Sequence, residues 1–280
     1  KLEKPMKVLF EGVCLETYKS EPTTDFDLSG VKESMNFLFV GHWMNGHLGQ
    51  DRKNVGMMIK VFLETFKNKK NPPGLILKTS MAGSSNMDRE EILKRIDTIR
   101  KTVKGTLPNI YLIHGNMSNG QMNEIYNHPK VSAMFNLTKG EGFGRPLLEF
   151  SLMQKPIITT KWSGHVDFLK PEFITLLPGK LENIHESAAT PNMLLKESQW
   201  FTVDYVKAGE SLISVVKDYK KWQEKSKRQS YYSKTNFSFD KMVELMGIYL
   251  ETFPTAVEEV KLKLPKLTKK LVLPKLIKTT

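Results

Sequence analysis

The sequence contains a single cysteine among 280 residues and no run of apolar residues long enough to cross a membrane. One cysteine excludes an internal disulfide framework and is typical of proteins from reducing compartments. No residue that would activate a thiol stands beside Cys14, so we expect this side chain to be buried or inert. The first seven residues also lack the apolar stretch of a secretory signal peptide. These absences predict a cytoplasmic protein.

Positive charge is concentrated at the C-terminal end of the chain. The net charge is +12, and residues 261–280 contribute seven lysines and no acidic residue. Leucines alternate with these lysines, and two prolines prevent one continuous helix. We interpret residues 256–280 as a solvated basic tail. Packing against a neighbouring domain, or contact with a membrane surface or a nucleic acid, are the alternatives for this tail.

The rest of the chain does not have the features of a nucleic-acid-binding protein. It has no zinc-finger spacing, no aromatic RNA-binding motif and no basic stripe outside the tail. We therefore predict no nucleic-acid partner for the folded part of the chain. Its 15 Phe, 8 Tyr and 4 Trp instead supply the material of a hydrophobic core.

Short apolar runs alternate with amphipathic segments through most of the sequence. A buried strand is predicted at 37–41, and further strands are predicted at 75–77, 110–113, 131–137, 156–160 and 173–177. Helices are predicted at 54–68, 88–103, 118–126, 147–153, 204–228 and 238–253. This order is typical of an α/β fold with a doubly wound, Rossmann-like parallel sheet, which binds ligands beyond the carboxyl ends of its strands. We predict an entry linker over 1–35 and one domain over 36–255, ahead of the basic tail.

The segment 138–149 has the most specific pattern in the sequence. It reads TKGEGFGRPLLE, with three glycines ahead of a proline at the expected start of a helix. The glycines allow close approach of a ligand, and the helix start offers unpaired N–H groups that favour a phosphate. Glu141 and Glu149 would instead accept hydrogen bonds from the hydroxyl groups of a ribose or a sugar. On the glycines alone, an ordinary turn between a strand and a helix is an equal alternative.

This pattern resembles the motif of two glutamates, seven residues between them, in retaining GT-B glycosyltransferases of group 1 (family 4-like). The group includes enzymes similar to glycogen synthase and sucrose synthase. The resemblance continues in register at 155–160 (KPIITT) and 163–169 (SGHVDFL), and upstream at 37–41 (FLFVG) and 53–55 (KNV). It covers roughly residues 8–253 and implies the C-terminal, donor-binding domain of a GT-B enzyme.

The resemblance also implies roles for single residues. Glu149 would hydrogen-bond the ribose of a UDP- or GDP-sugar, and Glu141 would lie near the donor sugar as a catalytic residue. Lys53 would be catalytic by neutralising the diphosphate, whose charge grows in the transition state. The remaining donor-binding positions implied are Gly41, His42, Arg52, Thr138, Gly142, Phe143, Gly144 and His165.

One position departs from the family pattern in a way that affects the diphosphate site. Enzymes of the family usually have an arginine after the glycine of the first strand, where this sequence has His42. Arg52, next to Lys53, is the residue that we expect to compensate for this change.

As a function, the resemblance implies transfer of a hexose-like sugar from a nucleotide-sugar to an unidentified acceptor, with retention and without a cofactor. The chain begins with Lys and matches only the donor-binding half. We therefore expect an acceptor-binding N-terminal domain to be absent from this chain, and little or no transfer by the chain alone. The alternative is a non-catalytic nucleotide-sugar-binding or scaffold module whose basic tail attaches to an acidic partner or, peripherally, to a membrane.

Two further patterns favour metal binding only weakly. Asp25 and Asp27 match the Asp-x-Asp pattern of GT-A glycosyltransferases, but that pattern follows a strand, whereas a loop is expected here. His42 and His47 lie five positions apart in a loop, without a further set of ligands. We predict no metal site.

Overall fold

Six parallel strands form the centre of the structure, a computed structural model that describes residues 6–44, 48–81, 83–188, 194–195 and 197–252. They run in the order β3-β2-β1-β4-β5-β6. The bounds are β1 (Asn36–His42), β2 (Gly74–Ser80), β3 (Ile110–Ile113), β4 (Val131–Phe135), β5 (Ile157–Thr160) and β6 (Thr175–Leu177). The direction of winding reverses between β1 and β4, so a ligand site is expected beyond the ends of these two strands. The predicted doubly wound α/β fold is confirmed.

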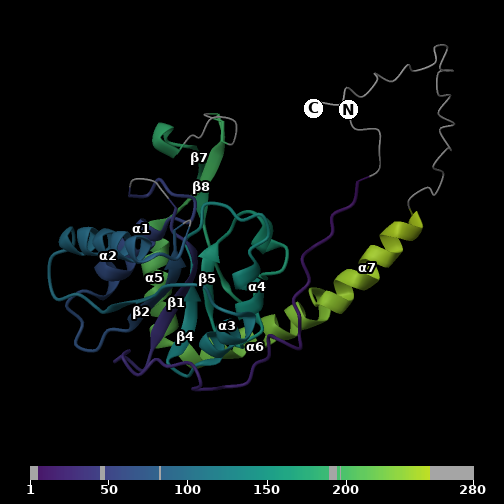
Figure 1. Cartoon of the computed structure of the whole chain (residues 1–280), viewed down its shortest axis with the longest axis horizontal. Helices are drawn as coiled ribbons and strands as arrows, with labels where there is room; N and C mark the ends of the chain where they lie inside the picture. Colours follow the sequence, from purple (N-terminus) through teal and green to yellow (C-terminus); the bar gives the residue numbers. More distant parts are fainter. Residues whose placement is uncertain (1–5, 45–47, 82, 189–193, 196, 253–280) are drawn as a thin grey trace, which may run out of the picture.

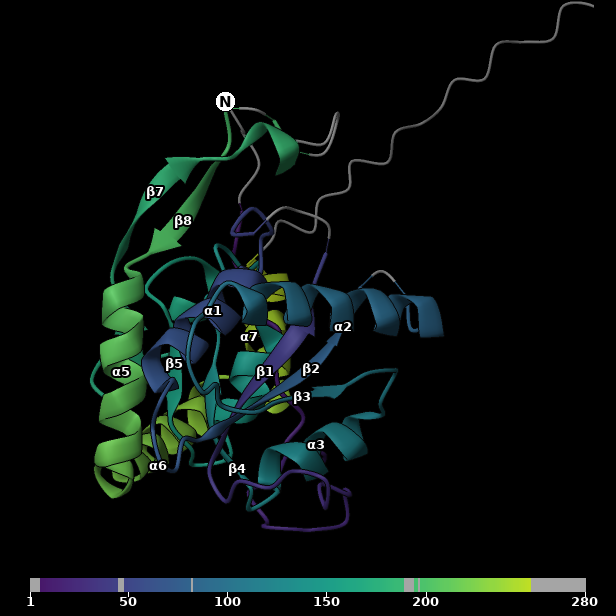
Figure 2. The ribbon, with the colours of Figure 1, turned by 90° about the vertical axis from the view of Figure 1, so that its left-hand side faces the viewer.

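Helices cover both faces of the sheet (Figures 1 and 2). One face packs against α1 (Val55–Phe66), α2 (Asn86–Lys101) and α5 (Tyr205–Lys217), and the other against α3 (Asn119–Asn127) and α4 (Arg145–Ser151). Alternate side chains of a strand point to opposite faces. In β1, Phe37 and Phe39 accordingly join the core beneath α1, whereas Leu38 joins the core beneath α4.

The start of α3 shows how local sequence sets a helix boundary. The Ser118 hydroxyl accepts a hydrogen bond from the Gln121 N–H, and the Gln121 side chain accepts one from the Ser118 N–H. This capping box satisfies two of the backbone donors that a helix start leaves unpaired. The predicted cap at Ser118 is therefore confirmed.

The helix predicted over 204–228 is wrong, because the chain forms two helices there. Helix α5 ends at Lys217, and α6 (Tyr219–Asn236) begins after Asp218, whose φ of −117° and ψ of 39° are not helical. The break turns α6 beneath the sheet (Figure 1), where it packs against α4. Its buried face is polar: Ser230 donates to the Leu152 carbonyl at 2.8 Å, and Gln229 donates to the Phe168 carbonyl at 2.7 Å.

The last helix, α7 (Phe239–Thr252), matches the prediction over 238–253 and is capped by the Ser238 hydroxyl, which accepts from the Lys241 N–H. It contacts the first described residues of the chain, since Val13 pairs with Ser238 just before the helix and the Tyr249 hydroxyl donates to the Val8 carbonyl at 3.2 Å. The neighbouring Cys14 is exposed, so of the two expectations for this side chain, buried or inert, only the second remains. The basic tail predicted over 256–280 lies outside the described residues.

An antiparallel hairpin follows β6. It was not predicted from the sequence. Its strands are β7 (Gly179–Asn183) and β8 (Gln199–Val203), and they project beyond the carboxyl ends of the central sheet (Figures 1 and 2). Short 3-10 turns occur at Gly164–Val166 and at Glu186–Ala188. Among the described helices, none is both long and apolar enough to cross a membrane.

Candidate active site

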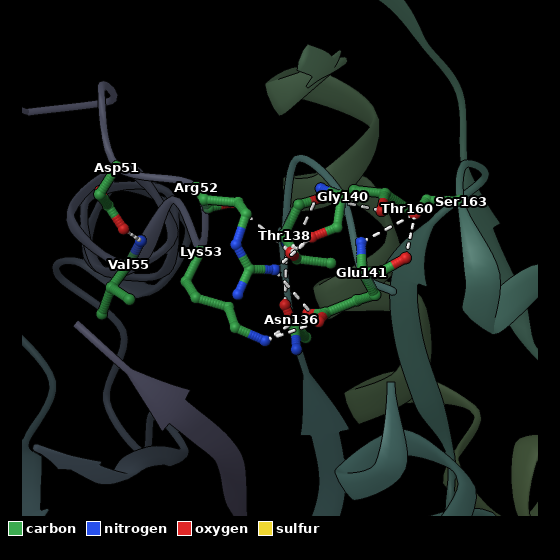
Figure 3. Close-up of polar contacts among 10 residues, drawn as sticks. All are labelled: Asp51, Arg52, Lys53, Val55, Asn136, Thr138, Gly140, Glu141, Thr160 and Ser163. Carbon is green, nitrogen blue, oxygen red and sulfur yellow. Dashed lines mark hydrogen bonds and ion pairs between the residues drawn. The ribbon is translucent and has the colours of Figure 1, made fainter. Parts of the chain in front are cut away.

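Two cations and one carboxylate meet at the point where the sheet reverses its winding (Figure 3). The Lys53 ammonium donates to both oxygens of Glu141, at 2.5 and 2.7 Å. Arg52 donates to the Gly140 carbonyl at 2.5 Å, and its guanidinium lies 3.3 Å from a Glu141 oxygen. Lys53 and Arg52 come from the segment before α1, whereas Glu141 follows β4. The fold thus brings together residues 88 positions apart.

Burial and pairing act in opposite directions on the ionisation of this cluster. The side chains of Lys53 and Glu141 are only 12% and 7% exposed. Burial favours the neutral form of Glu141, but Lys53 and Arg52 outweigh it and hold the pKa of the carboxyl below its ordinary value. Burial lowers the pKa of Lys53, although Glu141 opposes that shift. One carboxylate thus faces two cations, which leaves a net positive charge for an anionic ligand.

The loop of Glu141 is fixed by the loop that follows β5. The Ser163 hydroxyl accepts from the Glu141 N–H at 2.8 Å and donates to the Glu141 carbonyl. A Cβ added at Gly164 would lie 2.1 Å from the Gly142 carbonyl oxygen, so the two backbones touch there and only glycine fits at 164. The backbone of Glu141 is therefore held rigidly while its side chain faces the cations.

His165 lies directly beneath this loop and is fully buried. Its Nε2 donates to the Thr160 carbonyl at 2.6 Å, so the other ring nitrogen is the acceptor in the neutral ring. That atom, Nδ1, is buried and has no hydrogen-bond partner among the described residues. Burial lowers the pKa of the ring, which keeps Nδ1 available as an acceptor. A Cβ added at Gly144 would lie 3.1 Å from the Cβ of His165, so His165 packs directly against the glycine turn.

Glu149 lies on the second turn of α4, with different partners from Glu141. It is buried, its Oε2 accepts from the Tyr126 hydroxyl at 3.1 Å, and Arg145 lies 3.5 Å from its Oε1. Burial raises the pKa of this carboxyl, and the hydrogen bond from Tyr126 and the charge of Arg145 oppose that shift. A carboxylate has about four acceptor positions, so these contacts leave room for a ligand hydroxyl.

The remaining predicted residues line the same loops, with two differences in orientation. Thr138 is buried and accepts from the Gly140 N–H at 3.4 Å, and Gly41 packs beside the Lys53 stem. The ring of Phe143 packs on Phe168, with ring centres 5.0 Å apart, so the ring points toward the core rather than toward Glu141. The ring of His42 contacts Ser80 and Met81 at 3.1 Å, at the end of β2 rather than at Glu141.

Sequence reasoning missed two residues that position the cluster. Asp51 is buried and accepts from the Val55 N–H at 3.1 Å, which orders the turn that carries Arg52 and Lys53. Ser163 holds Glu141 as described above. Asp51 lies three positions ahead of the helix cap at Asn54, so its hydrogen bond does not follow the usual capping pattern. The role of Ser163 depends on contact between distant loops.

The residues weighed as metal ligands do not assemble with others. Asp27 accepts a hydrogen bond from the Ser29 N–H in an exposed loop, and His47 lies outside the described residues. In the part of the chain that the structure describes, there is no group of three or more His, Cys, Asp or Glu placed to hold a metal ion.

Solved structures share the fold of this chain at low sequence identity. Sucrose-phosphate synthase from Thermosynechococcus elongatus has a TM-score of 0.57 at 14% identity, covering 86% of this chain and 51% of that chain. The C-terminal domain of a glycosyl transferase group 1 family protein (LpcC) from Francisella tularensis has a TM-score of 0.54 at 12% identity, covering 81% and 100%. Anabaena Alr3699/HepE in complex with UDP-glucose has a TM-score of 0.59 at 15% identity, covering 88% and 57%.

The chain shares their fold. It spans about half the length of the synthase and of HepE, and the whole of the LpcC domain. No protein-family model and no curated protein sequence matches it. Two of the structures that share the fold, the LpcC domain and WaaG, are named as glycosyltransferases.

Proposed function

We propose that this chain is the nucleotide-sugar-binding part of a glycosyltransferase with the GT-B architecture. The observation that carries the proposal is the cluster of Lys53, Arg52 and Glu141 beyond the ends of β1 and β4. HepE has been solved in complex with UDP, and with UDP-glucose, on the same fold. A diphosphate would meet the two cations, and the hydroxyl groups of the ribose and sugar would meet the buried carboxylates.

The chemistry that we assign to these residues is stabilisation of the leaving group. When the bond from the sugar to the diphosphate breaks, negative charge develops on the diphosphate oxygens. Lys53 and Arg52 would balance this charge in place of a metal ion. Glu141 holds both cations in position before the donor binds, so the site is preorganised. His165 is fully buried and would support the glycine turn from behind rather than contact the donor.

The other half of the reaction requires groups outside this chain. In the proposal, a second domain binds the acceptor and closes over the donor, and a hexose-like sugar is transferred to that acceptor with retention. The coverage of about half of the synthase and of HepE supports this division.

Calorimetric titration with UDP, GDP and UDP-glucose tests the proposal directly. We expect one nucleotide to bind, with affinity unchanged by EDTA. Lys53→Met should weaken binding at least tenfold, because a charge-assisted contact to phosphate contributes about 1.5–3 kcal/mol. Lys67→Met, which removes an exposed lysine at the far end of α1, is the matched control. Absence of nucleotide binding, or equal binding by the two variants, would contradict the proposal.

A further inference from the structure

A cavity distinct from the Lys53–Glu141 cluster lies between the β7–β8 hairpin and the segment that precedes α1. Its volume is about 440 Å³, which is within the range of sites for small molecules. Its wall includes Lys139, Glu182, Asn183, Trp200, Thr202 and Tyr205. Neither Lys53 nor Glu141 lines it. The hairpin that forms one side projects from the sheet as a separate element (Figure 2).

Lys139 places a positive charge in the wall of this cavity. Its backbone is fixed on both sides, because its N–H donates to the Arg52 carbonyl at 2.8 Å and its carbonyl accepts from the Phe201 N–H at 3.1 Å. The residue is only 7% exposed, and its ammonium lies 5.8 Å from the centre of the Trp200 ring. Among the described residues, no hydrogen bond or ion pair to this ammonium is present.

The carboxylates nearest to Lys139 are engaged by other groups. Asp51 accepts from the Val55 N–H, and Glu182 lies 2.8 Å from the Lys180 ammonium. Burial lowers the pKa of Lys139, and the charges of Asp51 and Glu182 oppose that shift from a distance. Burying a cation without a hydrogen-bonded partner is costly. A ligand oxyanion placed on the ammonium would remove much of that cost.

The rest of the wall favours a hydroxylated ligand over a bare anion. Asn183, Thr202 and Tyr205 offer amide and hydroxyl groups, and Glu182 offers an acceptor for ligand hydroxyls. The indole of Trp200 adds an apolar surface on the same side. Glu182 would repel a small inorganic anion but would hydrogen-bond a sugar hydroxyl.

We propose that this cavity binds a small anionic saccharide, with its carboxylate or phosphate on Lys139 and its hydroxyl groups on Glu182, Asn183 and Thr202. No residue assigned to the proposed nucleotide-sugar site lines this cavity, although Lys139 lies between Thr138 and Gly140 in the chain. Neither site requires the other to be occupied.

Calorimetric titration of the whole chain with four probes tests the proposal: glucose 6-phosphate, glucuronate, glucose and inorganic phosphate. At least one charged sugar should bind ten or more times more tightly than both glucose and inorganic phosphate. In Lys139→Met this preference should disappear, because the charge-assisted contact is lost. Lys217→Met, an exposed lysine at the far end of α5, should behave as wild type.

Thr202→Val keeps the test decisive if Lys139→Met fails to fold, since it removes one hydroxyl at nearly constant volume. It should weaken binding of the charged sugar about threefold or more, with UDP binding unchanged. The proposal is overturned if glucose or inorganic phosphate binds as tightly as the charged sugars. It is equally overturned if the preference persists in Lys139→Met, or if Thr202→Val binds as wild type. Loss of UDP binding alone would count against the nucleotide-sugar site and leave this one intact.

Discussion

The ammonium of Lys53 bridges both carboxylate oxygens of Glu141, which joins the segment before α1 to the loop after β4. The two side chains are largely buried, and each neutralises the charge of the other, which would be costly to bury alone. The same contact preorganises two cations for a ligand. Stability and function are therefore coupled at this pair, and a substitution that removes the carboxylate should affect both.

Glu141→Gln should lower the free energy of unfolding at neutral pH by about 2 kcal/mol, because Lys53 remains buried without its anionic partner. Urea denaturation of the apo chain measures this difference. Adding a nucleotide that binds wild type should restore part of the loss, since the phosphates replace the missing charge. An unchanged unfolding midpoint in Glu141→Gln would contradict the coupling.

The difference in free energy of unfolding between wild type and Glu141→Gln should become smaller in acid. The pKa of Glu141 is lower in the folded chain than its ordinary value of 4.5, since the cations outweigh burial. Unfolding then takes up a proton below pH 4.5, so the contribution of the pair is fully present above that pH and is lost as pH falls through the folded pKa. The gap in stability between wild type and Glu141→Gln should be constant from pH 6 to 7 and narrow below pH 4.5. A gap that widens in acid would refute this assignment.

The contact between residues 142 and 164 predicts that alanine lowers the stability of the chain at one of these glycines but not at the other. Gly164→Ala places a Cβ 2.1 Å from the Gly142 carbonyl oxygen, a backbone atom that cannot move alone. It should cost about 2 kcal/mol or more and weaken nucleotide binding, because the Glu141 loop is displaced. A Cβ at Gly142 meets no atom within 4 Å, so the stability of Gly142→Ala should stay within about 0.5 kcal/mol of wild type. Equal unfolding midpoints for the two variants would show that the loops do not touch.

The sequence predicted the central sheet well because β1, β2, β4 and β5 are largely buried and read as continuous apolar runs, and the half-buried edge strand β3 is also apolar. The run at 110–113 coincides with β3, and the capping pattern at Ser118 located α3. The grouping of Arg52, Lys53 and Glu141 was also accessible, through the resemblance of their motifs. These features depend on local pattern, which a single sequence records directly.

The features that the sequence did not predict depend on contacts between distant segments. Strand β7 is mostly exposed, so its apolar pattern is weak, although the alternation of Phe201 and Val203 in β8 was visible. The break at Asp218 involves neither proline nor glycine. It is stabilised from outside, since the Tyr219 hydroxyl donates to the Ser132 carbonyl at 3.0 Å and α6 packs its polar face on α4. No pattern in the sequence around Lys139 indicates that this side chain is buried beneath a hairpin.

The capping box of α3 offers a test of local stability away from both proposed sites. Ser118→Ala removes the acceptor of the Gln121 N–H and should lower the free energy of unfolding by about 1 kcal/mol. Ser211→Ala removes a hydroxyl that only bonds back to the Lys207 carbonyl within α5, so it should be neutral or slightly stabilising. Urea denaturation of both variants makes the comparison. A larger loss in Ser211→Ala than in Ser118→Ala would contradict the assigned role of the cap.

Lys155 should make the stability of the chain rise with pH above neutrality. It lies ahead of β5, and its ammonium donates to the Tyr126 and His128 carbonyls at 2.7 and 2.9 Å. Burial lowers its pKa from 10.5 to about 7. Between these values the unfolded chain binds more protons than the folded chain, so the free energy of unfolding increases as pH rises through that window.

Urea denaturation at pH 7, 8 and 9 compares wild type with Lys155→Met, in which this titration is absent. The variant loses two hydrogen bonds and should be less stable throughout, but its stability should rise less steeply with pH. Lys104→Met, which removes an exposed lysine after α2, should follow the wild-type slope. The other titrating groups are common to all three chains, so they cancel in the comparison. Parallel slopes for wild type and Lys155→Met would mean that Lys155 keeps its proton in the folded chain, held by the two carbonyls more strongly than burial disfavours it.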